Sequence, residues 1–144
     1  MKKLLLTGVA ALFVATGAAD ATDKLKPDEL FQKLYQECEE QGAMPGPIAA
    51  CLFEKEEAFG KELEQVYNNT LQLAGTNNTL LRESQRNWLK YQESNCKLDE
   101  MWSSVEGAVY GRNAKAQCLL KTTLQRLQDL REIVIFLETY GPVR

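Results

Sequence analysis

The sequence predicts an all-α protein: a small antiparallel helical bundle, with three long helices, a short N-terminal helix and two disulfides. Three observations lead to this prediction. Apolar residues recur at steps of three and four over long stretches, and no useful stretch shows the alternation of a strand. The four cysteines form an even set in a small chain. Short connections between the helices make sequential neighbours antiparallel.

Residues 1–21 have the three parts of a secretory signal peptide. Two lysines precede an apolar run over residues 4–15, and Ala19-Asp20-Ala21 matches a cleavage site. We place cleavage after Ala21, with Ala19 as the alternative. The apolar run is too short to span a bilayer comfortably. The segment therefore predicts a periplasmic or secreted protein of one domain, residues 22–144, which leaves the membrane after cleavage.

Prolines and glycines delimit the first two predicted helices. A short helix begins at Pro27, because a proline in the first turn sacrifices no hydrogen bond, and it ends before Gly42. A long helix begins near Pro47 and ends at Gly75. The core-facing positions of this long helix are Ile48, Leu52, Lys55, Phe59, Leu63, Val66, Thr70 and Leu73.

The third predicted helix runs from about Leu80 to Trp102, and the fourth ends near Thr139. Residues 107–113 contain two glycines and are predicted to form the loop between these helices. The core-facing positions of the third helix are Leu81, Gln85, Trp88, Gln92, Asn95, Leu98 and Trp102. Those of the fourth are Ala116, Leu120, Thr123, Leu127, Leu130, Val134 and Leu137.

The antiparallel order brings all four cysteines to one end of the bundle. Our preferred pairing joins Cys38 to Cys51 and Cys96 to Cys118. The first disulfide would hold the N-terminal helix, and the second would close the base of the predicted loop. Each is expected to contribute about 3 kcal/mol in the chain-entropy description. A pairing of Cys51 with Cys96 and of Cys38 with Cys118 is the alternative.

The composition argues against several classes of partner. The formal net charge is −3, and it becomes −4 when residues 1–21 are removed, because they contain two lysines and one aspartate. An acidic surface disfavours nucleic acids and anionic membranes and leaves a cationic protein as the favoured partner.

Catalytic and metal chemistry is also disfavoured. The chain contains no histidine, which excludes a Ser-His-Asp triad and a histidine ligand. The cysteines form no CxxC pair, so a zinc site is a poor alternative to disulfides. Carboxylate pairs such as Asp99-Glu100 are interpreted as solvated helix faces rather than as a glycosidase pair. We therefore predict a binding protein that is not an enzyme and has no metal or cofactor.

The densest polar pattern lies in residues 81–96. Gln85 and Trp88 share the core-facing stripe, and the indole N–H of Trp88 needs an acceptor that Gln85 can supply; alternatively, Gln85 holds a buried carbonyl. Arg86 and Tyr91 are expected to form a second polar cluster, with Glu93 or with Arg126 of the last helix. A polar network that locks two helices is the simpler interpretation, and a binding surface is the functional one.

These residues resemble a known family. Gln85-Arg86-x-Trp88-Leu89-x-Tyr91 is followed by Cys96, a glycine-containing loop, Cys118 and Thr122-Thr123-x-x-Arg126. Together with Cys38, Cys51 and Leu63-x-x-x-Tyr67, this order is similar to that of the LprI-like lysozyme inhibitor family of small exported bacterial proteins. The likeness covers roughly residues 38–131. It implies a helical, disulfide-bonded periplasmic domain and inhibition of lysozyme.

The chain departs from the family pattern in two places. The family usually has Arg-Asp after the tyrosine, where this chain has Gln92-Glu93, so an ion pair is removed. The family loop often carries Gly-Gly-Ser, where this chain has the sequence from Glu106 to Gly111. Both changes bear on whether the target is the same.

Two functions follow from these expectations. In the first, the protein inhibits a cationic lysozyme-type muramidase, which its acidic surface attracts. The predicted loop would then enter the enzyme's cleft, with Tyr110 and Arg112 at its tip and Trp102 or Glu106 in support. In the second, the protein is an envelope interaction or stress-tolerance module that has no enzyme target.

Overall fold

The computed structural model describes residues 25–142, and the predicted signal peptide lies outside them. Four α-helices follow one another: α2 (Pro27–Gln41), α3 (Pro45–Ala74), α4 (Asn78–Ser103) and α5 (Ala108–Tyr140). Two short 3₁₀ turns, η1 (Gly75–Asn77) and η2 (Ser104–Glu106), connect the last three helices. The described chain contains no strand, so the predicted fold class is confirmed.

The helix ends follow from local chemistry. Pro27 opens α2, and the side chain of Glu29 accepts a hydrogen bond of 3.1 Å from the backbone N–H of Lys26. This bond satisfies a donor that the first helical turn leaves free. Gly75 and Gly107 have φ angles of 57° and 133°, which side-chain-bearing residues rarely adopt. Glycine is therefore required at both connections between the long helices.

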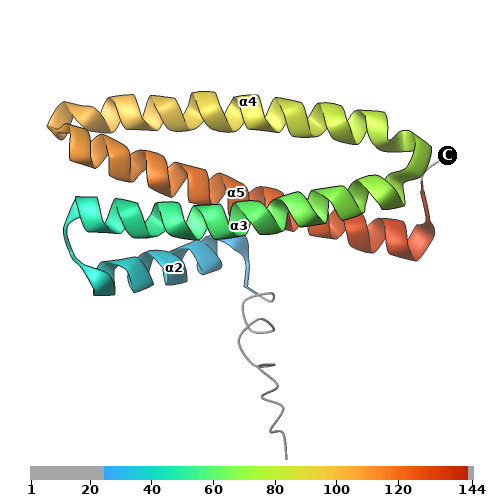
Figure 1. The fold of residues 1–144 in the computed structure, drawn as a ribbon, viewed down its shortest axis with the longest axis horizontal. Coiled ribbons are helices and arrows are strands. Elements are labelled where there is room, and N and C mark those ends of the chain that lie inside the picture. Colours follow the sequence, from blue (N-terminus) through green and yellow to red (C-terminus); the bar gives the residue numbers. More distant parts are fainter. Residues whose placement is uncertain (1–24, 143–144) are drawn as a thin grey trace, which may run out of the picture.

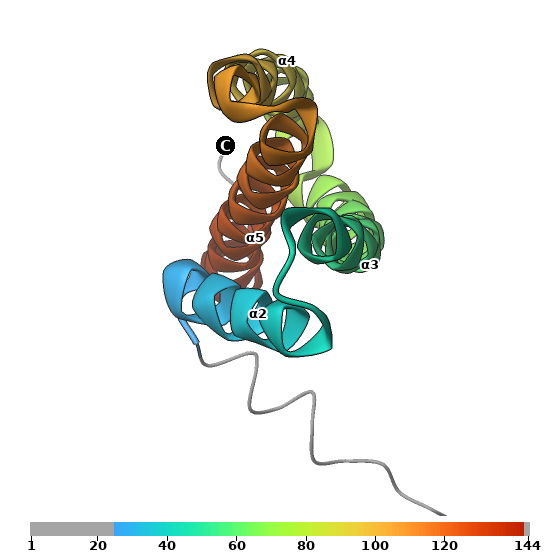
Figure 2. The same ribbon diagram turned by 90° about the vertical axis from the view of Figure 1, so that its left-hand side faces the viewer.

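Helix α5 lies at the centre of the bundle and contacts α2, α3 and α4 (Figure 1). The short α2 covers α3 and α5 only in the half of the bundle where α3 and α5 begin (Figures 1 and 2). One core cluster fills this half and includes Phe31, Leu52 and Leu120. A second cluster lies further along α3 and α5 around Leu63, Leu127 and Leu130, with Trp88 of α4 packed against it.

The disulfides have the preferred pairing. Cys38 joins Cys51, and their Cα atoms are 5.6 Å apart; Cys96 joins Cys118, with a Cα separation of 5.4 Å. No described cysteine is free. The first bond ties α2 to α3 and the second ties α4 to α5, so both covalent links hold the same end of the bundle.

The predicted loop over residues 107–113 is wrong. Helix α5 begins at Ala108, so Tyr110 and Arg112 lie in its first turns. Gly111 is needed for packing rather than for flexibility. A Cβ atom built on Gly111 would lie 1.9 Å from Ser104 Oγ and 2.6 Å from the carbonyl oxygen of Glu100. The close approach of α5 to the end of α4 therefore admits only glycine at this position.

The predicted core stripe of the third helix is wrong beyond Cys96. Leu98 is 46% exposed and Trp102 is 68% exposed, because α4 packs mainly against α5 and makes little contact with α3. Lys55 is the charged member of the stripe predicted for α3. It forms an ion pair of 2.8 Å with Glu37 of α2. Within residues 25–142, no helix combines the length and hydropathy that a membrane span requires.

Candidate functional site

The family-motif residues meet around a buried arginine of α5. The side chain of Arg126 is 8% exposed. Its Nε donates a hydrogen bond of 2.9 Å to Gln85 Oε1, and its Nη2 donates one of 3.0 Å to Ser84 Oγ. The guanidinium carbon lies 6.0 Å from the centre of the Trp88 ring. The side-chain oxygen of Gln85 therefore accepts a hydrogen bond from Arg126. The prediction that Gln85 bonds to the Trp88 indole or to a buried carbonyl is wrong.

Arg126 also lines an open pocket of about 380 Å³ between α4, α5 and the start of α2. We call this hollow the Arg126 pocket; its lining residues are Asp28, Trp88, Tyr91, Lys121, Thr122, Gln125, Arg126 and Asp129. Burial lowers the pKa of Arg126, since a desolvated cation is disfavoured, while the nearby charge of Asp129 acts in the opposite direction.

Not every motif residue joins this cluster. Arg86 is exposed and lines a separate small hollow with Tyr67, Thr79 and Arg82, so the predicted pairing of Arg86 with Tyr91 is wrong. Leu89 is 51% exposed and points toward a different groove. The sequence prediction thus correctly associated Arg126 with the α4 motif but chose the wrong partners for it.

A second polar network, which the sequence did not reveal, crosses the centre of the bundle. Gln92 Nε2 of α4 lies 2.8 Å from Thr122 Oγ1 and 3.0 Å from Thr123 Oγ1 of α5. Thr123 in turn donates a hydrogen bond of 3.2 Å to Glu56 Oε1 of α3. The available signal was that the sequence places two polar residues, Gln92 and Thr123, on the core-facing positions of neighbouring helices.

Burial also affects Glu56. Desolvation raises the pKa of its carboxyl group, the hydrogen bond from Thr123 lowers it, and the neighbouring charge of Glu57 raises it further. The net direction is upward, because partial burial disfavours the charged form more than one hydroxyl stabilises it. This carboxyl group accepts the hydrogen bond from Thr123 that links α3 to the network between α4 and α5.

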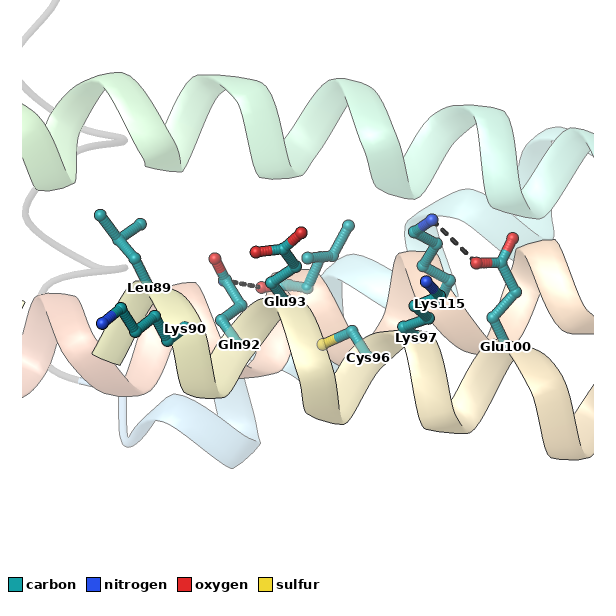
Figure 3. Close-up of a pocket in the computed structure, with 9 residues that line it drawn as sticks. Leu89, Lys90, Gln92, Glu93, Cys96, Lys97, Glu100 and Lys115 are labelled. Carbon is teal, nitrogen blue, oxygen red and sulfur yellow. Dashed lines mark hydrogen bonds and ion pairs between the residues drawn. The ribbon is translucent and has the colours of Figure 1, made fainter. Parts of the chain in front are cut away.

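A groove of about 560 Å³ runs beside this network along α4 and α5. Figure 3 shows Glu100 of α4 and Lys115 of α5 pointing toward each other at one end, where they form an ion pair of 2.8 Å. Leu89 and Lys90 lie at the other end (Figure 3). The groove is lined by charged side chains of both signs.

The four residues predicted to contact a partner are only partly brought together. Trp102, Glu106 and Tyr110 line one hollow at the end of the bundle where α4 and α5 meet. Arg112 is directed elsewhere, and its guanidinium carbon lies 5.6 Å from the centre of the Phe53 ring of α3. Its predicted place at a loop tip beside Tyr110 is therefore wrong, because the helix turns the two side chains to different faces.

Exposed apolar side chains gather at this end of α4 and α5. We call them the tip surface; its members are Met101, Trp102, Val105, Val109 and Tyr110, with exposed fractions from 42% to 84%. Three of them belong to α4 and η2 and two to the start of α5. Trp102, Val105 and Tyr110 of this group line the same hollow, so they lie close together.

The described residues contain no group of histidine, cysteine or carboxylate side chains that could hold a metal ion. The features that stand out are a helical bundle held by disulfides, an exposed apolar tip and a buried arginine cluster. They define a small disulfide-bonded helical protein of one bundle.

Comparison with known families agrees with this class. The family model described as Lysozyme inhibitor LprI matches residues 35–130. The chain therefore belongs to the LprI lysozyme inhibitor family. Comparisons with curated proteins and with solved structures give no match.

Proposed function

We propose that this protein is an exported inhibitor that binds a lysozyme-type muramidase through the tip surface. The observation that carries the proposal is the exposure of this surface: Trp102 is 68% exposed and Val105 is 84% exposed. Both are large apolar side chains on a rigid helical hairpin. Membership of the family supplies the class of target.

The rigidity of the tip favours tight binding. The disulfide between Cys96 and Cys118 and the close packing at Gly111 both hold α4 against α5. A surface that is already ordered loses little conformational freedom when it binds. Tryptophan and tyrosine are the residues that most often dominate binding energy at protein interfaces, so Trp102 and Tyr110 are the expected anchors.

The charge around the tip favours a cationic enzyme. Asp99 and Glu106 are exposed beside the apolar side chains, and the whole chain has a net charge of −3. Acidic groups around an apolar centre attract a basic protein and raise its association rate more than its final affinity. The two disulfides and the signal-peptide pattern of residues 1–21 support action outside the cytoplasm.

The test is lysis of a peptidoglycan suspension by lysozyme in the presence of the oxidised protein, residues 22–144. We expect dose-dependent loss of lysis that weakens at high salt. Trp102→Ala and Tyr110→Ala should each raise the half-inhibitory concentration by about tenfold or more, as expected for interface anchors. Tyr140→Ala is the matched control, because Tyr140 is 75% exposed at the opposite end of the bundle.

Introduction of a negative charge into the tip surface gives a second comparison. Val105→Glu places a carboxylate in the tip surface, and Ile135→Glu places one at a similarly exposed position on the far half of α5. Only the first should abolish inhibition. Equal inhibition by all variants would refute the tip as the contact surface. Absence of inhibition with several lysozyme types would refute the function and favour an envelope interaction module.

A further inference from the structure

The Arg126 pocket contains a buried cation whose charge the nearby carboxylate of Asp129 favours without forming an ion pair with it. Arg126 is more than nine-tenths buried, and within residues 25–142 no carboxylate forms an ion pair with it. Its two hydrogen bonds go to the neutral oxygens of Gln85 and Ser84. Burying a charge is costly unless it is paired, so buried arginines usually have a carboxylate partner.

The guanidinium retains donors that point away from these two bonds. An arginine has five N–H donors, and Nε and Nη2 each use one here. Asn113 Oδ1 is the buried side-chain atom that lacks a partner in the described chain. Nη1 of Arg126 donates to no described residue and does not belong to this class of buried, unpartnered atoms, so it is not completely enclosed by the protein. It provides a donor group where the pocket meets the buried part of the side chain.

The rest of the pocket combines flat apolar surface with polar groups. Trp88 and the 55% exposed Tyr91 contribute rings from successive turns of α4. Lys121 adds a second cation from α5, and its Nζ lies 4.5 Å from the centre of the Phe31 ring. Asp28 and Asp129 add carboxylates that accept hydrogen bonds from hydroxyl groups.

We propose that the Arg126 pocket binds a saccharide that carries a carboxylate group. The carboxylate of the ligand binds the guanidinium of Arg126, which forms strong charge-assisted hydrogen bonds, with Lys121 beside it. The sugar ring packs on Trp88 and Tyr91, and its hydroxyl groups donate to Asp28 and Asp129. A volume of about 380 Å³ is within the range of small-molecule sites and accommodates one monosaccharide unit.

This proposal is independent of the proposed function. The pocket lies on the side of α4 and α5 that faces the start of α2, whereas the tip surface lies at the end where α4 meets α5. Loss of one site should leave the other intact. A variant of the pocket that still inhibits lysozyme, or a tip variant that still binds the saccharide, would show this directly.

Tryptophan fluorescence provides the measurement. The chain contains two tryptophans, so Trp88 is the only reporter in a Trp102→Phe background. We expect neutralised N-acetylmuramic acid, a sugar acid, to change this fluorescence in a saturable manner. N-acetylglucosamine has a similar ring without the carboxylate, and D-lactate has a carboxylate without the ring. Each should bind at least about tenfold more weakly, which corresponds to the loss of one good interaction.

Variants assign the binding to named side chains. Arg126→Gln should abolish saturation, and Tyr91→Ala should weaken binding by about tenfold. Tyr91 is exposed, so its replacement tests the site even if Arg126→Gln does not fold. Arg112→Gln is the matched control, because Arg112 lies near the start of α5, away from the pocket. This variant should bind the ligand like the parent protein.

Three outcomes would overturn the proposal. The first is no saturable change with N-acetylmuramic acid. The second is equal binding of either control ligand, because that would remove the need for the carboxylate or for the ring. The third is unchanged binding in Tyr91→Ala together with unchanged binding in a folded Arg126→Gln variant, which would place the ligand elsewhere.

Discussion

The amide nitrogen of Gln92 on α4 lies 3.0 Å from the hydroxyl oxygen of Thr123 on α5. Thr123 is 1% exposed, and its hydroxyl group donates onward to Glu56 of α3. One side-chain amide therefore begins a chain of hydrogen bonds that joins three helices. Such a network is stabilising only while each buried group has its partner.

Gln92→Ala should lower the free energy of unfolding by about 1–3 kcal/mol. The hydroxyl and carbonyl groups that the Gln92 amide contacts would stay buried and would lose this hydrogen-bond partner. Urea denaturation measures this change. Gln128→Ala is the control, since the Gln128 amide bonds only to Glu132 on the surface of its own helix. A loss no larger than that of the control would contradict a structural role for the network.

Two glycines in helices should respond in opposite directions to alanine. Gly111→Ala should destabilise the protein by about 1–3 kcal/mol, because the new methyl group overlaps Ser104 and the backbone of Glu100. Gly60→Ala should stabilise it by about 0.5–1 kcal/mol, since the nearest atom outside its own helix backbone is 3.7 Å away and alanine favours a helix. Thermal unfolding compares them, and a Gly111→Ala variant as stable as the parent would show that α5 does not approach α4 as described.

The pH dependence of stability should change when Glu56 is replaced by glutamine. The pKa of Glu56 is raised in the folded state, chiefly by burial, so the folded protein keeps this proton at a pH where the unfolded chain has lost it. The stability contributed by this group is therefore present below the ordinary pKa of 4.5 and is lost as the pH rises through the folded pKa. The free energy of unfolding of Glu56→Gln, relative to that of the parent, should consequently be higher at neutral pH than near pH 4.

Glu57 is the matched control for this experiment. Its pKa is lowered by the hydrogen bond and charge of Lys61, so its contribution is present above 4.5 and is lost on acidification. Glu57→Gln should show the opposite trend with pH. Denaturant midpoints measured across the acid range decide the matter, and parallel pH profiles for the two variants would contradict the burial of Glu56.

Removal of the second disulfide should loosen the tip end of the bundle. Cys96 and Cys118 are 22 residues apart, and the chain-entropy description assigns about 3 kcal/mol to a loop of this size. The double variant Cys96→Ala/Cys118→Ala should lose about this much stability in urea. Mass mapping of non-reduced peptides is the independent check, and a peptide that joins Cys51 to Cys96 would disprove the pairing.

Much of the fold could be predicted from the sequence because its signals are local. Pro27, Gly42 and Gly75 act on their own backbone, so the ends of α2 and α3 were predicted to within a few residues. The periodicity of α5 placed Leu120, Leu127 and Leu130 in the core, where they are buried. The antiparallel order then brought the cysteines together, and the preferred pairing is confirmed.

The tertiary structure decided the features that depend on distance between helices. A glycine looks the same in a sequence whether it allows a turn or a close contact, so Gly111 suggested a loop although it lies inside α5. Helical periodicity placed Trp102 on the core-facing stripe, although the side chain is exposed, since periodicity shows which residues share a face but not which part of that face another helix covers.

The sequence by itself determined the helices, their order and the family to which the chain belongs. The structure alone decided that Arg126 bonds to Gln85 and Ser84, that Gln92 joins three helices and that Arg112 faces away from Tyr110. The physical reason is that helix formation depends on neighbouring residues, whereas side-chain partners depend on the rotation and depth at which separate helices pack.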